Sequence, residues 1–228
     1  MDPSNKEPAR PSTLHGPDLI AGTHYRGYLP HRKVEGATYF VTFRLAGSLP
    51  QTVLDAYRHE RDAIVARAAQ FNRPLSGDEQ QRLRELHSER IERYLDAGIG
   101  ECWLAQPDIA RVVATALRYF EGERYELYAW VVMPNHVHAV FRPLAKHTLS
   151  AILHSWKSYT GVQANRLLGR SGESFWESES YDHVMRDLED FARWREYTIN
   201  NPAAANLCSR PEAWPYSSAY MSYPADEH

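Results

Sequence analysis

The alternation of apolar and polar positions first identifies the strands. Residues 37–45 (ATYFVTFRL) are β-branched and aromatic with a rough period of two, which predicts a strand. Residues 124–133 and 136–141 have the same character and are separated only by Pro134 and Asn135. A turn dipeptide between two such runs predicts an antiparallel hairpin.

Other segments repeat their apolar residues at helical spacing. Residues 51–70 and 78–97 are charged helical patterns on either side of a break, which predicts a helical hairpin. Residues 108–120 predict another helix, and residues 148–168 a long one that begins at Thr148 or Ser150. A strand, a helix, two strands and a helix predict a small α+β domain with an antiparallel sheet and helices on one face.

The same patterns suggest how the chain is divided. Residues 1–23 are rich in Pro, Ser and Gly without periodicity, so we expect a flexible tail. We expect one domain over residues 24–172, with the helical hairpin inserted at about 51–97. Residues 173–228 are expected to form a C-terminal extension packed on the same domain.

Composition excludes several classes of protein. With 228 residues, 43% hydrophobic and 24% charged, the chain can form one sizeable core and is not a wholly disordered protein. No apolar run approaches the roughly 18 residues that a membrane span needs. The N-terminus lacks the layout of a signal peptide, and two cysteines make no disulfide framework. The reducing cytoplasm is therefore the predicted location.

The net charge of −3 gives no global attraction to nucleic acid, so any such contact must be local. Residues 142–172 carry five basic side chains and no acidic one, whereas the following stretch is strongly acidic. This basic block is a candidate phosphate-binding surface, although such clusters are often only solvated surface. Its members are Arg142, Lys146, Lys157, Arg166 and Arg170.

The candidate metal-binding motif is His136-Val137-His138. Side chains in a strand alternate, so both imidazoles point to one face, as two ligands of one metal would. The preceding turn places the pair at a strand edge, where a site can open. The following helix carries Tyr159 and Gln163, four residues apart and hence on one face. If that face looks onto the histidine side of the sheet, two imidazoles, an amide oxygen and a phenol come together.

Such a site suits phosphoryl chemistry. Neutral ligands leave a divalent cation its full charge as a Lewis acid, and the set fits Mg²⁺ or Mn²⁺, although zinc also binds two histidines. A phenol held in line with a phosphate can attack the phosphorus and form a phosphotyrosine. Lys157 and the arginines of the basic block would hold flanking phosphates, and Trp156, Phe175 and Trp176 are candidates for stacking on unpaired bases.

Two segments, YAWVVMPNHVHAVFRP (residues 128–143) and LSAILHSWKSYTGVQAN (residues 149–165), resemble the single-tyrosine HUH transposases, the IS200-like family. FWESESYDHVMRD (175–187), YTINNP (197–202) and WPYSS (214–218) are similar to one branch, the REP-associated tyrosine transposases. The resemblance covers about residues 25–220. It implies a ferredoxin-like α+β fold with a central antiparallel sheet.

The resemblance also implies an activity and a set of roles. His136 and His138 would be metal ligands with Gln163 as the third, and Tyr159 would be the nucleophile. The substrate would be single-stranded DNA with an imperfect hairpin in a repeated palindromic element. Cleavage would leave a 5′-phosphotyrosine and a 3′-hydroxyl, and ends could be rejoined. Such a protein would associate with the nucleoid, and both a monomer and a homodimer are open.

Three functions remain after this step. The leading hypothesis is a metal-dependent single-stranded DNA endonuclease and strand transferase. The second is a hairpin-binding regulator that has kept the scaffold without cleavage. The third, a zinc-dependent hydrolase, is weaker because Val140 stands where a third alternating histidine is needed and no HExxH motif is present. Tyr181, near a histidine and an aspartate in the sequence, is a reserve nucleophile.

Overall fold

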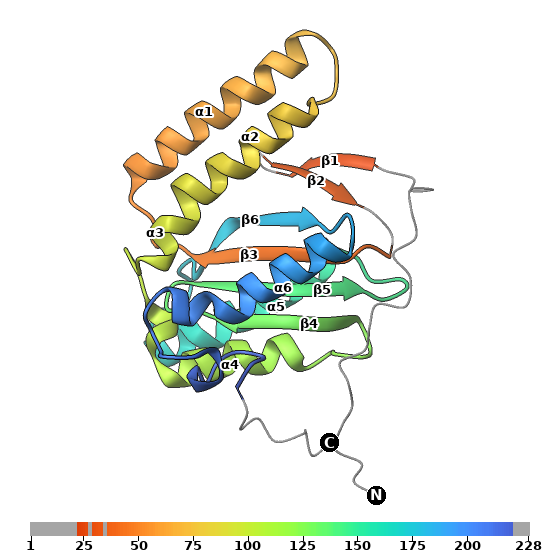
Figure 1. Cartoon of the computed structure of the whole chain (residues 1–228). Coiled ribbons are helices and arrows are strands. Elements are labelled where there is room, and N and C mark those ends of the chain that lie inside the picture. Colours follow the sequence, from red (N-terminus) through yellow and green to blue (C-terminus); the bar gives the residue numbers. More distant parts are fainter. Residues whose placement is uncertain (1–21, 27–28, 34–35, 221–228) are drawn as a thin grey trace, which may run out of the picture.

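The computed structural model describes residues 22–26, 29–33 and 36–220, and its centre is a four-stranded antiparallel sheet (Figure 1). The strand order is β4-β5-β3-β6. The strands are β3 (Tyr39–Leu45), β4 (Tyr125–Val132), β5 (His136–Pro143) and β6 (Trp176–Val184). A separate two-stranded sheet pairs β1 (Gly22–Arg26) with β2 (Leu29–Lys33). The predicted strands at 37–45, 124–133 and 136–141 are therefore confirmed to within two residues.

One face of the sheet carries the main hydrophobic core. The helices α4 (Pro107–Arg118) and α5 (Leu149–Leu168) pack on this face. They correspond to the helices predicted at residues 108–120 and 148–168. Alternate residues of the sheet supply the other half of this core: Tyr39, Val41, Phe43, Val137, Ala139 and Phe141. Thr148 caps α5 by accepting a hydrogen bond from Ala151 N at 3.2 Å.

The opposite face is covered by α6 (Leu188–Ala204). Phe40, Ala129 and Val140 point to this side and pack with Trp194 and Tyr197. The predicted class, α+β with a central antiparallel sheet, is confirmed. The helices, however, lie on both faces rather than on one, because the aromatic segment after residue 188 returns as a helix across the second face.

The sheet also differs from expectation at its edges. β6 was not predicted as a strand, because acidic and serine residues occupy the alternate positions of WESESYDHV. It forms one edge of the sheet by pairing with β3, from Tyr39 opposite Val184 to Leu45 opposite Trp176. β5 lies between β4 and β3 in the interior of the sheet, and the histidine pair lies at the start of this strand, directly after the Pro134-Asn135 turn.

The predicted helical hairpin is present and projects beyond β6 at the edge of the sheet (Figure 1). It comprises α1 (Gln51–Gln70), α2 (Gly77–His87), a π-helical turn η1 (Ser88–Glu92) and α3 (Arg93–Asp96). Ser76 and Glu79 form a capping box at the start of α2, through Glu79 N to Ser76 Oγ at 3.2 Å and Ser76 N to Glu79 Oε2 at 2.9 Å. Its own apolar cluster contains Leu49, Leu54, Tyr57, Leu86, Ile91 and Leu95.

The remaining elements are two 3₁₀ turns, η2 (Trp103–Ala105) and η3 (Pro211–Ala213). Most of the predicted tail, residues 1–21, lies outside the described residues, while Gly22 and Thr23 begin β1. No helix in the described part of the chain is long and apolar enough to cross a membrane. The predicted boundaries of tail, insertion and extension stay predictions.

Candidate metal and tyrosine site

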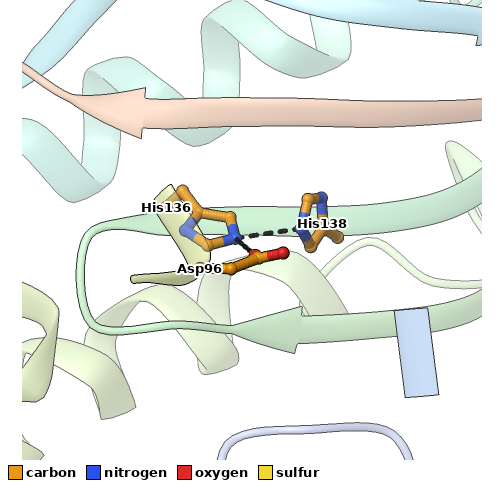
Figure 2. A group of neighbouring side chains, drawn as sticks. All are labelled: Asp96, His136 and His138. Atoms are coloured by element: carbon orange, nitrogen blue, oxygen red, sulfur yellow. Dashed lines mark hydrogen bonds and ion pairs between the residues drawn. The ribbon is translucent and has the colours of Figure 1, made fainter. Parts of the chain in front are cut away.

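The two histidines lie at the centre of the face that α6 covers. β5 points His136 and His138 to this side, and both side chains are completely buried. Their Nε2 atoms are 2.9 Å apart. Figure 2 shows the two rings side by side on β5, joined by a dashed line. The period of two in a strand therefore brings the pair together as the sequence predicts.

Two neighbouring side chains fix the orientation of these imidazoles. Asn135 Oδ1 lies 2.7 Å from His136 Nδ1, and Asn135 Nδ2 donates to the carbonyl of Ile99 at 3.2 Å. An amide oxygen can only accept, so His136 Nδ1 carries the proton and Nε2 keeps its lone pair. Thr42 Oγ1, 2.8 Å from His138 Nδ1, can accept from that nitrogen in the same way. Two lone pairs then face each other, an arrangement that a cation relieves.

Burial keeps both histidines neutral. It lowers the pKa of His136 to about 3 and that of His138 well below its ordinary value, where the neighbouring His136 adds to the effect. A neutral imidazole is the form that binds metal, so at pH 7 no proton has to be displaced from Nε2.

A carboxylate from the inserted hairpin joins the pair. Asp96, the last residue of α3, places Oδ1 3.7 Å from His136 Nε2 (Figure 2). One ligand atom from each of Asp96, His136 and His138 lies within 4.8 Å of the others. Burial raises the pKa of Asp96 to about 6. No sequence pattern pointed to this residue, because it lies 40 positions before His136 in the segment predicted only as a helical hairpin.

Helix α6 brings an amide and a phenol to the same place. Asn201 Nδ2 is 3.4 Å from Asp96 Oδ1, and Asn201 Oδ1 is buried with no hydrogen-bond partner among the described residues. Tyr197, one turn earlier, packs its ring edge-on against His138 with the centroids 5.3 Å apart. Its hydroxyl is also buried without a hydrogen-bond partner in the described part. Burial raises the pKa of Tyr197, and the carboxylates of Glu92 and Asp96 raise it further.

These groups fit a divalent cation. Two neutral imidazoles, one carboxylate and a buried amide oxygen that accepts nothing else form a mixed nitrogen and oxygen donor set. Such sets bind Mn²⁺ and, with water completing the shell, Mg²⁺. Buried polar atoms are normally satisfied, so the unpartnered Asn201 Oδ1 is itself a sign of a ligand.

The predicted tyrosine and glutamine do not reach this site within the chain. α5 packs on the opposite face of the sheet, so the sheet separates Tyr159 and Gln163 from the histidines. Tyr159 points outward and is 55% exposed. The condition on which both assignments depended, a shared face with the histidines, is therefore not met here. The reserve tyrosine, Tyr181, does lie on the histidine side, where it stacks on His87 with centroids 3.9 Å apart.

The predicted base-stacking tryptophans are core residues. Trp156 and Trp176 are 2% and 8% exposed. Trp156 Nε1 donates to Tyr125 Oη at 3.0 Å, and Trp176 Nε1 donates to Thr160 Oγ1 at 2.8 Å. Neither ring therefore has a free face for an unpaired base in this structure.

Most of the basic block is held in internal contacts. Lys157 Nζ donates to the carbonyls of Glu177 at 2.6 Å and Ser178 at 2.9 Å. Arg142 pairs with Glu126 at 2.7 Å, and Arg170 with Glu173 at 2.6 Å. Lys146 and Arg166 are exposed. Only these last two therefore present a cation of the block fully to solvent, and the phosphate-binding role of the block stays a prediction.

Comparison with known proteins shows which proteins the chain resembles. Residues 103–201 match the family model "Transposase IS200 like", a segment that contains both histidines, Tyr197 and Asn201. Through this segment, which is less than half of the chain, the protein is similar to the IS200-like transposases, as the sequence motifs predict.

The chain is also similar to the REP-associated tyrosine transposase of Escherichia coli (strain K12), with 24% identity over 108 residues. This match spans 45% of the present chain and 62% of the relative. A solved structure of a REP-associated tyrosine transposase bound to a REP hairpin aligns over 86% of this chain and 82% of its own, with 17% identity and a TM-score of 0.46.

Proposed function

We propose that this protein is a metal-dependent single-stranded DNA endonuclease and strand transferase in which Tyr197 is the nucleophile. One observation carries the proposal. Tyr197 and Asn201 converge from one helix on the cluster of Asp96, His136 and His138, each with a buried polar atom that has no hydrogen-bond partner in the described residues. A phenol beside a cation site is the arrangement that tyrosine-mediated phosphoryl transfer requires.

The residues have distinct roles. His136, His138, Asp96 and Asn201 would hold a Mg²⁺ or Mn²⁺ ion, which when bound supplies positive charge against the phosphate oxygens. Asn135 and Thr42 keep the two Nε2 lone pairs directed at that point.

The covalent step is a displacement at phosphorus. Tyr197 Oη forms a bond to the phosphorus while the bond from phosphorus to the 3′ oxygen breaks. The phenol gives up its proton and the departing 3′ oxygen takes one up, so the products are a 5′-phosphotyrosine and a free 3′-hydroxyl. Attack by a 3′-hydroxyl on the phosphotyrosine reverses the sequence and joins two ends. Packing of the Tyr197 ring against His138 and Trp194 fixes the direction from which the oxygen attacks.

The proposed substrate is single-stranded DNA that carries a hairpin. The support is the sequence resemblance to the REP-associated branch and the similarity to a protein of that name in Escherichia coli. The protein and DNA would form a covalent adduct that survives denaturation.

The test is a denaturing gel of the protein incubated with labelled hairpin DNA from the flanks of its own gene, with Mn²⁺ or EDTA. We expect a shifted band that needs the metal, persists in Tyr159→Phe and is absent in Tyr197→Phe. Tyr159→Phe is the matched control, since it removes the same hydroxyl from a helix on the other sheet face. An adduct lost in Tyr159→Phe and kept in Tyr197→Phe contradicts the assignment. If no adduct forms while a native gel shows tight hairpin binding, the non-cleaving regulator replaces the enzyme.

A further inference from the structure

The proposed site is closed to a DNA strand. His136 and His138 are 0% exposed, and the hydroxyl of Tyr197 is buried. A groove of about 740 Å³ runs beside α6 and reaches Asp96, Tyr197 and Asn201. Its lining is mainly acidic, with two arginines among the acids, so it is a poor entry for a polyanion. The charged residues of this lining are Asp96, Arg186, Asp187, Glu189, Asp190, Arg193 and Glu196. A strand must therefore enter from another side, and an element of the fold must move.

The inserted hairpin is built to move as a unit. Its apolar cluster is separate from the main core, and Figure 1 shows α1 and α2 projecting beyond β6, away from the rest of the sheet. The two chain segments that connect it to the sheet meet at a narrow neck, where Glu101 N donates to Gly47 O at 3.1 Å. Gly100 is packed tightly in this neck, since a Cβ there would lie 2.4 Å from Gly47 O. Gly98, with φ of +64°, lies between the neck and Asp96 and has open space around it.

The hairpin touches the sheet face through polar and aromatic contacts. His87 stacks on Tyr181, and the buried Arg61 lies 3.9 Å from Glu179 of β6. Asp96 meets Asn201 Nδ2 at 3.4 Å. Water can replace contacts of this kind at a lower free-energy cost than it can expose an apolar core. The hairpin can therefore lift while its own cluster and the main core stay intact.

A cation lies beneath the hairpin beside the histidines. Arg44 is directly opposite His136 in the pairing of β3 with β5, and Thr42 is opposite His138, so all four share one face. Arg44 is only 9% exposed. It contacts Glu177 Oε2 and Ser48 Oγ, each at 3.3 Å. Burial lowers the pKa of Arg44, because the charge has lost its water.

Residues of both the hairpin and the sheet line a cavity next to Arg44. A small cavity of about 40 Å³ lies between the hairpin and strands β3 and β6. Arg44, Thr42 and Tyr181 line it from the sheet, and Arg58 and His87 from the hairpin. Opening the hairpin would carry Arg58 away and widen this cavity into a cleft with Arg44 on its floor and Glu179 on its β6 side, which leads along the sheet face to the histidine pair. Arginine suits a phosphate in such a place, because its planar fork donates two hydrogen bonds at once.

We propose that the hairpin of residues 51–96 is a lid over a strand-binding cleft, and that Arg44 on the cleft floor binds a backbone phosphate next to the scissile one. This inference rests on the proposed function for the identity of the strand. It assigns the entry side to the region between the hairpin and the sheet, and it gives the closed form to the DNA-free protein. Asp96 moves with the lid, so it would be a cation ligand only in the closed form, and His136, His138 and Asn201 would hold the cation when the lid is open.

Hydrogen exchange of the full-length Tyr197→Phe protein, with and without the hairpin oligonucleotide, tests the lid. We expect DNA to speed exchange of amides in α1–α3 while those of β4 and β5 stay unchanged. In the DNA-free protein, Glu179→Gln should speed lid exchange by about two- to fivefold, the order expected for losing one partly exposed ion pair. Glu173→Gln, which removes a carboxylate whose partner is Arg170 outside the lid, is the matched control and should change nothing there.

Salt dependence of binding tests Arg44. For single strands, each lost phosphate contact decreases the magnitude of the negative slope of log K against log salt by about 0.7. We expect this decrease in Arg44→Gln and none in Arg111→Gln, which removes a 66% exposed arginine on α4 at the far face. Thermal melts of both variants show that each is folded before binding is compared.

The outcomes separate the lid from the chemistry. If wild-type protein forms the covalent adduct while lid exchange is unaltered by DNA and Arg44→Gln keeps the full slope, the lid is wrong and the proposed function stands. If DNA loosens the lid and Arg44→Gln loses one contact without any adduct in wild type, the lid stands and cleavage is wrong. Faster exchange in α6 instead of α1–α3 moves the entry to the acidic groove and overturns the proposal. Absence of any binding overturns both.

Discussion

Thr42 is the side chain through which the metal site can be weakened with the least disturbance of the fold. It is 4% exposed on β3, and its hydroxyl lies 2.8 Å from His138 Nδ1. Replacing it with valine keeps the branched shape that suits a strand and removes only the acceptor. His138 then either buries an unpaired Nδ1 proton or moves that proton to Nε2. Both results oppose binding of a cation at Nε2.

The expected loss follows from these two routes. A buried donor left without a partner costs about 1–3 kcal/mol. Loss of a hydrogen-bond partner behind a metal ligand typically lowers metal affinity by about 10- to 100-fold. The two estimates agree, since a factor of ten corresponds to about 1.4 kcal/mol. We therefore expect Thr42→Val to weaken Mn²⁺ binding by at least about tenfold at pH 7.

Calorimetric titration of metal-stripped protein with Mn²⁺ measures this change. Thr160→Val is the matched control. Thr160 is also a buried threonine, and it accepts from Trp176 Nε1 at 2.8 Å on the other face of the sheet. That variant should lose stability toward urea and keep the wild-type affinity for Mn²⁺. Equal affinity in wild type and Thr42→Val, or an equal loss in both variants, would refute the role given to the Thr42 hydroxyl.

Two further predictions concern the fold around the site. Against the opposing effect of burial, hydrogen bonds from His183 and Arg186 lower the pKa of Asp190 to about 2. A carboxyl with a depressed folded pKa stabilises above its unfolded pKa of about 3.9 and loses that contribution as pH falls toward the folded value. Asp190→Asn should therefore destabilise the protein to urea at pH 7, and its difference from wild type should shrink between pH 4 and pH 2; a constant difference would contradict the pairing. Gly100→Ala should lower the melting temperature far more than Gly98→Ala. Both have positive φ, a strain of about 1–3 kcal/mol for alanine, but only at Gly100 would the new Cβ collide with backbone, 2.4 Å from Gly47 O. Equal shifts would show that the neck is not tightly packed.

The sequence predicted those elements whose periodicity decides their structure. The strands before and after Asn135 and the helices that bury Ile109 or Ile152 all show a clear apolar period and appear where expected. β6 was missed for a physical reason. As an edge strand with half-exposed Glu177 and Glu179, it lacks the apolar alternation by which a buried strand is recognised.

The candidate site was predicted in part. The histidine pair follows from strand geometry alone, since positions two apart must share a face. The tyrosine does not, because a tyrosine followed four residues later by an amide occurs twice, at Tyr159 and at Tyr197. Spacing cannot say which sheet face a helix covers. The apolar side of α5 could pack on either face of the sheet. Only the folded structure shows that it packs on the face opposite the histidines.

The arrangement of the two faces explains how the fold tolerates a buried polar site. The main core is complete on the face of α4 and α5, where no proposed metal ligand points. The ligands come from widely separated positions, Asp96, His136, His138 and Asn201, and meet only after β6 has paired with β3 and α6 has returned across the second face. Unpaired donors and acceptors there would destabilise the protein without a cation, so metal binding and docking of both α6 and α3 favour one another. Because the main core on the face of α4 and α5 stabilises the fold, the opposite face of the sheet can open for a substrate.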